Sequence, residues 1–221
     1  MMIPGLSTIG GYSICSTPDD LPSLRLAVKN ARHPPTKWCY NDAREGDTVQ
    51  LRPGGDFGLD LSLAPQETGE ERTPFRLKSG TTSVVLIAGG IGINPLFSVL
   101  QNFATCLEND TAVAQEVLLI YAASSRAELA FEDEIRDAAR AHPSRITVRF
   151  IVPDAPEAEE DYTAGDSLTL EQITGALQSR SLSDQESICL LCGPPAMIEA
   201  AEFHCIALGI KPNNIHYEKW W

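Results

Sequence analysis

The sequence predicts an α/β protein with a parallel five-stranded sheet and helices on both of its faces, preceded by an antiparallel β region. The first observation is a series of apolar runs after residue 82, which predict strands at about 83–88, 116–122, 145–152, 187–192 and 214–219. The second is helical spacing of apolar residues between these runs, which predicts helices at about 95–106, 127–141, 169–179 and 195–208. Alternating strands and helices are typical of a parallel sheet covered by helices.

The first 60 residues have a different pattern, dominated by turns and short strands. Residues 24–29 alternate between apolar and polar side chains, which predicts a half-buried strand. Residues 48–52 predict a second strand, because Pro53 and two glycines end the run. Residues 60–81 are polar and contain prolines and a charge run, so we expect a loop and linker there.

Composition excludes several classes of protein. The 221 residues carry a formal net charge of −13, which argues against nucleic-acid binding. An acidic surface favours solubility, with attraction of a basic partner protein as the alternative. The six cysteines lack zinc-site spacing, so we expect no metal site and instead buried thiols in a reducing, intracellular compartment. No targeting segment and no apolar run long enough to span a membrane is visible in the sequence.

A glycine-rich turn after the first predicted strand of the sheet is the best candidate for a binding site. It contains Gly89, Gly90, Gly92, Asn94 and Pro95. Glycines allow a phosphate to approach the backbone, and the free N–H groups of the following helix attract an anion. Asn94 is a candidate helix cap, and Pro95 suits the first turn. The alternative is a sharp strand-to-helix turn that needs glycine only for its shape.

A second turn of the same design follows the strand at 187–192. It runs from Cys192 through Gly193 and Pro194 to Met197. Ligands of open parallel sheets bind outside the carboxyl ends of the strands. The two turns can therefore line one crevice if their strands are neighbours.

The two turns together resemble those of the ferredoxin–NADP reductase superfamily. The motif G-G-x-G-I-x-P at 89–95 and the motif C-G-P-P-x-M at 192–197 occur in the same order as in that superfamily. Residues 10–16 and the ending 217–221 are similar to the oxidoreductase NAD-binding domain-containing protein group within it. The resemblance implies a partial FAD-binding barrel, with N-terminal strands missing, and linker at 1–75, then an NAD(P)-binding domain at 76–221.

The resemblance implies a flavin-dependent oxidoreductase that passes hydride or electrons between NAD(P)H and FAD to an unknown acceptor. One expected partner is an electron-acceptor protein. The alternative is an NAD(P)-binding regulatory or electron-transfer subunit that has lost flavin binding. Relatives of this group imply a mitochondrial location, with a cytoplasmic one as the alternative.

The resemblance also implies roles for individual residues. The turn at 89–95 holds the dinucleotide pyrophosphate, and Cys192, Gly193, Pro194 and Met197 lie beside the nicotinamide. For Cys192 the alternative is a small apolar filler. Trp221, or its neighbour Trp220, covers the flavin or simply anchors the terminus. Glu218 matches a carboxylate near the flavin, or serves as an ion-pair partner.

On the flavin side, Tyr12 is expected to pack on the ring and Ser13 to hydrogen-bond the ring nitrogen that accepts hydride. Thr36 is expected to contact the FAD pyrophosphate. Two departures argue against tight FAD binding: Gly10 stands where the family has an arginine, and Pro34 and Pro35 remove N–H donors.

The choice between NAD and NADP depends on the residues after the second strand of the sheet. Ser124, Ser125 and Arg126 permit a 2′-phosphate, whereas Glu128 would suit the free 2′-hydroxyl. For Arg126 the alternative is a solvated charge at the start of a helix.

Overall fold

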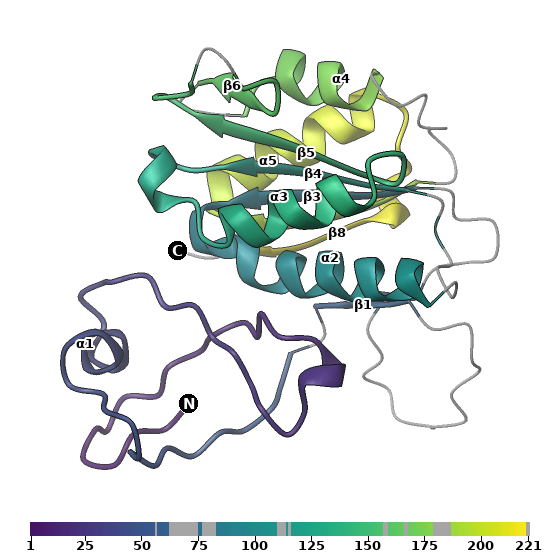
Figure 1. The fold of residues 1–221 in the computed structure, drawn as a ribbon. Coiled ribbons are helices and arrows are strands. Elements are labelled where there is room, and N and C mark those ends of the chain that lie inside the picture. Colours follow the sequence, from purple (N-terminus) through teal and green to yellow (C-terminus); the bar gives the residue numbers. More distant parts are fainter. Residues whose placement is uncertain are drawn as a thin grey trace.

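A six-stranded sheet, parallel throughout, forms the centre of the molecule (Figure 1). The structure is a computed structural model that describes residues 1–55, 57–61, 75–76, 83–109, 114, 116–156, 159–165, 168–178 and 187–219. The strands are β3 (Ser83–Gly89), β4 (Glu116–Ala122), β5 (Ile146–Val152), β6 (Tyr162–Ala164), β7 (Ser187–Gly193) and β8 (Ile215–Lys219). Their order across the sheet is β6-β5-β4-β3-β7-β8, and every neighbouring pair is parallel.

Helices cover both faces of the sheet, as predicted. They are α2 (Ile93–Glu108), α3 (Glu132–Ala141), α4 (Leu170–Gln178) and α5 (Pro195–Ala207). One core cluster joins α2 and α3 to the sheet through residues such as Leu100 and Ile135, and the other joins α4 and α5 through Ile173 and Ile198. The central strand β3 is buried at every position, as expected where a parallel strand is covered on both sides.

The sheet has one strand more than the five predicted. β6 lies between the predicted strand at 145–152 and the predicted helix at 169–179, and it pairs with β5 at the edge of the sheet. It has three residues, of which only Tyr162 is buried. A strand this short carries no apolar alternation that would distinguish it from a loop.

The prediction of antiparallel strands at the N-terminus is wrong for the described residues. In residues 1–55 the antiparallel pairing is limited to an isolated bridge between Met2 and Gln50. No barrel is visible there, and the short strands β1 (Leu59–Asp60) and β2 (Phe75–Arg76) pair in parallel. The segment expected to contact the FAD pyrophosphate through Thr36 is a helix, α1 (Pro34–Asn41).

The segment at 24–29 is extended but forms no ladder because its backbone groups have other partners. The Arg25 N–H donates to the Ser16 hydroxyl, and the Arg25 carbonyl accepts from the Cys15 N–H. The Ala27 carbonyl accepts a hydrogen bond of 2.8 Å from the Asn94 side chain. These bonds tie the N-terminal segment to the start of α2 instead of to another strand.

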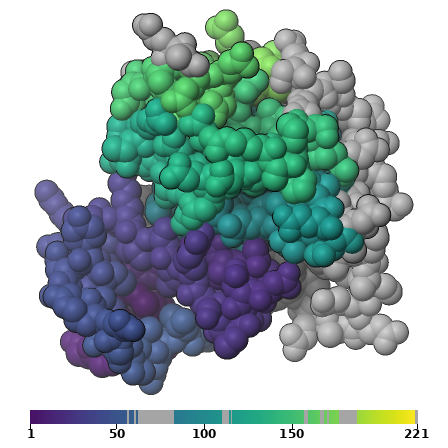
Figure 2. All heavy atoms as spheres, in the orientation of Figure 1, coloured from purple at the N-terminus to yellow at the C-terminus, as the bar shows by residue number. Residues whose placement is uncertain are grey.

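The N-terminal segment packs against the helix layer formed by α2 and α3 (Figure 2). The Arg25 guanidinium lies over the stacked rings of Phe97 and Phe131, 5.2 and 4.9 Å from their centroids. The Ser98 hydroxyl donates to the Ser16 carbonyl over 2.8 Å. The segment therefore has a defined position beside the carboxyl edge of the sheet. No helix in the described part of the chain is both long and apolar enough to cross a membrane.

Candidate functional site

The two glycine turns lie in direct contact, which confirms that they share one edge of the sheet. β3 and β7 are neighbours, and Ala88 is paired with Cys192. A Cβ atom added to Gly92 would lie 2.3 Å from the Cys192 carbonyl oxygen. A Cβ atom added to Gly193 would lie 3.1 Å from the Cα and N atoms of Gly89.

The glycines of these turns have two different roles. Gly89, Gly92 and Gly193 are required for packing, because a side chain at each would overlap a neighbouring atom such as the Met197 sulfur. Gly90 has a left-handed backbone with φ of +52°, and a Cβ atom there would meet nothing within 4 Å. Packing therefore explains three of the glycines and backbone conformation explains Gly90, whose open side leaves room for a ligand.

A single 3₁₀ turn, η2 (Gly90–Gly92), leads into α2, and the Ile93 N–H is bonded to the carbonyls of Gly90 and Ile91. Pro95 lies in the first turn of α2, as predicted, but the helix cap is Gly92 and the prediction of an Asn94 cap is wrong. Asn94 instead donates to the N-terminal segment, and its Oδ1 atom is buried without a partner in the described part of the chain. A buried amide oxygen without a partner is costly, which makes Asn94 a group that a bound molecule could satisfy.

Three residues predicted to be catalytic meet at one carboxylate oxygen. The Ser13 hydroxyl donates to Oε2 of Glu218 over 3.0 Å, and the Cys192 sulfur lies 4.0 Å from the same oxygen. Ser13 comes from the N-terminal segment, Cys192 from the end of β7 and Glu218 from β8. Cys192 is fully buried, while Ser13 and Glu218 are half-buried.

The other two residues predicted on the flavin side contact each other. The Tyr12 hydroxyl lies 3.2 Å from the Thr36 hydroxyl, and Thr36 is buried in the first turn of α1. A Cβ atom at Gly10 would lie 2.4 Å from the Tyr12 ring, so the ring rests on the Gly10 backbone. Burial raises the pKa of Tyr12, and the bond to Thr36 lowers it in part. The arginine that the family has at position 10 would not fit without displacement of Tyr12, a contact that sequence reasoning missed.

The turn η3 (Arg126–Glu128) follows β4 at the same edge of the sheet. Oε2 of Glu128 accepts a hydrogen bond of 3.0 Å from the Ser124 hydroxyl. The same oxygen forms an ion pair with Lys29, 2.9 Å from its Nζ atom. These two contacts lower the pKa of Glu128. Lys29 belongs to the N-terminal segment, so sequence reasoning had no signal for its proximity.

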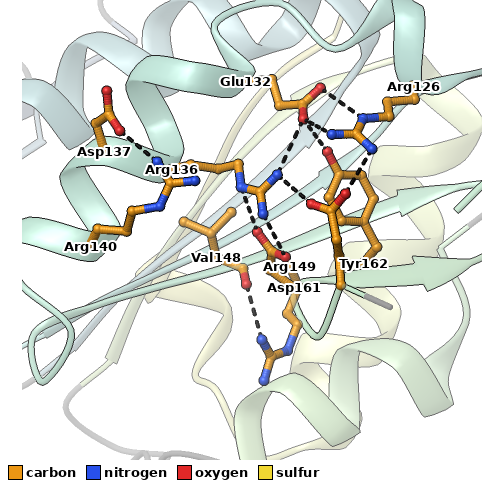
Figure 3. A network of polar contacts seen from close by, with 10 residues as sticks. Arg126, Glu132, Arg136, Asp137, Arg140, Val148, Arg149, Asp161 and Tyr162 are labelled. Carbon is orange, nitrogen blue, oxygen red and sulfur yellow. Dashed lines mark hydrogen bonds and ion pairs between the residues drawn. The ribbon is translucent and has the colours of Figure 1, made fainter. Parts of the chain in front are cut away.

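Arg126, the candidate for a 2′-phosphate, is part of an ion-pair network (Figure 3). Its guanidinium contacts Glu132 at 2.8 Å and Glu159 at 2.9 Å. Burial alone would raise the pKa of Glu132, but hydrogen bonds from Arg126 and Tyr162 outweigh it and lower that pKa. The carboxylates likewise raise the pKa of Arg126, which stays charged.

Two further predictions concern the terminal tryptophans and metal binding. Trp221 and Trp220 lie outside the described residues. Within the residues that the structure describes, no group of three or more His, Cys, Asp or Glu side chains could hold a metal ion.

Comparison with known proteins gives these features a family context. The family model for the oxidoreductase NAD-binding domain matches residues 86–202. The chain is 32% identical over 229 residues to oxidoreductase NAD-binding domain-containing protein 1 of Danio rerio, covering 99% of this chain and 78% of that protein. It is 28% identical over 209 residues to NADH-cytochrome b5 reductase 1 of Lodderomyces elongisporus, covering 94% of this chain and 61% of the reductase.

Among solved structures, the flavohem-like FAD/NAD-binding domain of nitric oxide dioxygenase from Vibrio cholerae superimposes with a TM-score of 0.68 and 22% identity. The match covers 100% of this chain and 81% of that domain, and it establishes a shared fold. The matched family model and the similarity over 99% of this chain show that it belongs to the oxidoreductase NAD-binding domain-containing protein 1 family.

Proposed function

We propose that this protein is an NADH-dependent flavin oxidoreductase. The observation that carries the proposal is the Glu218 oxygen that contacts both Ser13 and Cys192. Through this oxygen, the segment expected at the flavin ring lies against the turn expected at the nicotinamide. Two flat rings that exchange a hydride must be held in contact, so such a junction is what the reaction requires.

The dinucleotide would lie along the edge of the sheet where the two turns meet. Gly90 allows close approach of a phosphate, and the N-terminal end of α2 offers the positive end of the helix dipole. The unpartnered oxygen of Asn94 is a further polar group at this place. The residues present therefore fit a dinucleotide.

The adenosine ribose would be recognised by Glu128. A carboxylate accepts hydrogen bonds from both ribose hydroxyl groups, whereas it repels a 2′-phosphate. Lys29 and Ser124 hold Glu128 in one orientation and keep it ionised. We therefore propose NAD(H) instead of NADP(H).

The flavin site fits in part. Ser13 and Glu218 are suited to the ring: the Ser13 hydroxyl donates its hydrogen to Glu218, which leaves the Ser13 oxygen as an acceptor for an N–H of the ring. The phosphate end fits poorly, because Gly10 supplies no charge and Tyr12 is hydrogen-bonded to Thr36. When bound, the flavin would supply the hydride acceptor. The chain would orient the rings and exclude water, and it would hold the flavin weakly enough for exchange.

The poor fit of the phosphate end at Gly10 and Tyr12 supports a second candidate, an NAD(H)-binding subunit without flavin chemistry. Calorimetric titration of the full chain with NADH and with FAD separately, followed by NADH-driven dye reduction with added FAD, tests both candidates. Binding of NADH with FAD-dependent turnover supports the enzyme. Binding of NADH without FAD binding or turnover supports the subunit, and a chain that does not bind NADH contradicts both.

The Ser13→Ala variant connects the activity to the junction. It should reduce dye reduction without changing the affinity for NADH. Ser7→Ala, at an exposed position, is the matched control and should behave as wild type.

A further inference from the structure

The turn η3 presents two opposite charges that are bound to different partners. Glu128 contacts Ser124 and Lys29. Two residues earlier, Arg126 contacts Glu132 and Glu159 and lies over the Tyr162 ring, 4.9 Å from its centroid (Figure 3). A cation next to the ribose position could bind a 2′-phosphate, so the partners of Arg126 matter for the choice of nucleotide.

All three nitrogens of the Arg126 guanidinium are engaged. Nη2 lies 2.8 Å and Nε 3.4 Å from the Glu132 carboxylate, and Nη1 lies 2.9 Å from Glu159. The side chain nevertheless keeps 37% of its surface exposed. Arg126 is therefore accessible to solvent, but three of its five N–H donors already point at carboxylates.

The two carboxylates that hold Arg126 are themselves held from the other side. Arg136 forms ion pairs with both Glu132 and Glu159, and the Tyr162 hydroxyl donates to Glu132. Arg136 also contacts Asp161 at 3.1 Å. A network anchored at several points keeps its geometry better than an isolated surface pair.

We propose that Glu132 and Glu159 are specificity-determining residues, which withhold Arg126 from a 2′-phosphate and so favour NAD(H) over NADP(H). This inference rests on the proposed binding of NAD(H) at this edge of the sheet. A 2′-phosphate arriving here would meet the Glu128 carboxylate, and the guanidinium of Arg126 in the same turn is already bound to the carboxylates of Glu132 and Glu159. Removal of those two charges should release Arg126.

The experiment is a set of calorimetric titrations with NADH and NADPH on the full chain. In the Glu132→Gln/Glu159→Gln variant, NADPH affinity should rise about three- to tenfold because one charge-assisted contact is gained. NADH affinity should stay within about twofold, since the ribose hydroxyl groups make no use of Arg126. Addition of Arg126→Gln to this variant should cancel the gain.

The matched control is Asp133→Asn/Asp137→Asn, which removes the same charge from α3 at two exposed positions. It should leave the ratio of NADPH to NADH affinity unchanged. In wild type, Arg126→Gln should also leave this ratio within about twofold, because a committed guanidinium contributes no phosphate contact.

Three results would overturn the inference: no gain in NADPH affinity in the double variant, a gain that survives Arg126→Gln, or a strong loss of NADPH affinity on Arg126→Gln in wild type. The last result requires no variant of the carboxylates, so the inference can fail even if the double variant does not fold. If wild type binds neither nucleotide, the proposed function itself fails. If wild type binds NADH but the ratio of NADPH to NADH affinity does not change in the double variant, only this inference fails.

Discussion

Replacement of Gly92 by alanine tests the contact between the two turns. The backbone of Gly92 has φ of −61° and ψ of −7°, which alanine adopts without strain, so the perturbation is purely steric. The new Cβ atom would lie 2.3 Å from the Cys192 carbonyl oxygen, 2.6 Å from its carbon and 2.8 Å from the Gly193 nitrogen. All three are backbone atoms of a buried turn, so no rotation of a side chain can relieve the overlap.

The expected cost lies near the upper end of the range for an overpacked site, about 3 kcal/mol. For a chain of this size that corresponds to a fall in melting temperature of about 6–12 °C, measured by circular dichroism or calorimetry. The control is Gly175→Ala in α4, where a Cβ atom meets nothing within 4 Å. Alanine there should stabilise the helix by about 0.5–1 kcal/mol.

Displacement of the turn should also weaken NADH binding by at least about tenfold, equivalent to about 1.4 kcal/mol. A Gly92→Ala protein with wild-type melting temperature and wild-type NADH affinity would refute the close packing of the two turns. Equal effects at Gly92 and Gly175 would refute the steric explanation, since only Gly92 has a close neighbour.

Three further predictions concern single polar groups. Ser13→Ala should lower the rate of NADH-driven, FAD-dependent reduction about tenfold or more, because the hydroxyl directed by Glu218 is lost, and stopped-flow absorbance would measure this. Tyr121→Phe should lower the free energy of unfolding by about 1–2 kcal/mol in urea titration, because the buried hydroxyl accepts the Ala130 N–H over 3.1 Å; an unchanged urea midpoint would count against it. The folded-state pKa of Glu132 is lowered, so its stabilisation is fully present above the ordinary value of 4.5 and is lost as pH falls through the folded-state pKa. Unfolding curves at pH 3 to 6 should therefore show a smaller pH dependence in Glu132→Gln than in wild type, and equal slopes would contradict this.

Local sequence patterns were sufficient for five of the six strands of the sheet and for the helices that cover it. Buried parallel strands such as β3 are continuous apolar runs, and the helices between them have regular apolar spacing. The pairing of the two glycine motifs also indicated that their strands are neighbours. Periodicity placed the start of α3 too early, because Phe131 has a left-handed backbone with φ of 62° and the helix begins only after it.

Long-range side-chain contacts could not be predicted in the same way. The segment at 24–29 has the alternation of a strand, but its backbone bonds to Cys15, Ser16 and Asn94. Pro34 and Pro35 lie in the first turn of α1, a helix that the sequence did not predict, and the loss of their N–H donors toward a flavin stays a prediction. The partners of Arg126 lie 6 and 33 residues away, and no spacing rule connects them.

The most direct test of the central claim is hydrogen–deuterium exchange of the full chain with and without NADH. The claim is that the turn at 89–95 and the turn at 192–197 bind one dinucleotide together. It predicts that NADH slows exchange in peptides from both turns, with the same dependence on NADH concentration. Protection of one turn alone, or of neither while NADH is bound elsewhere, would contradict it.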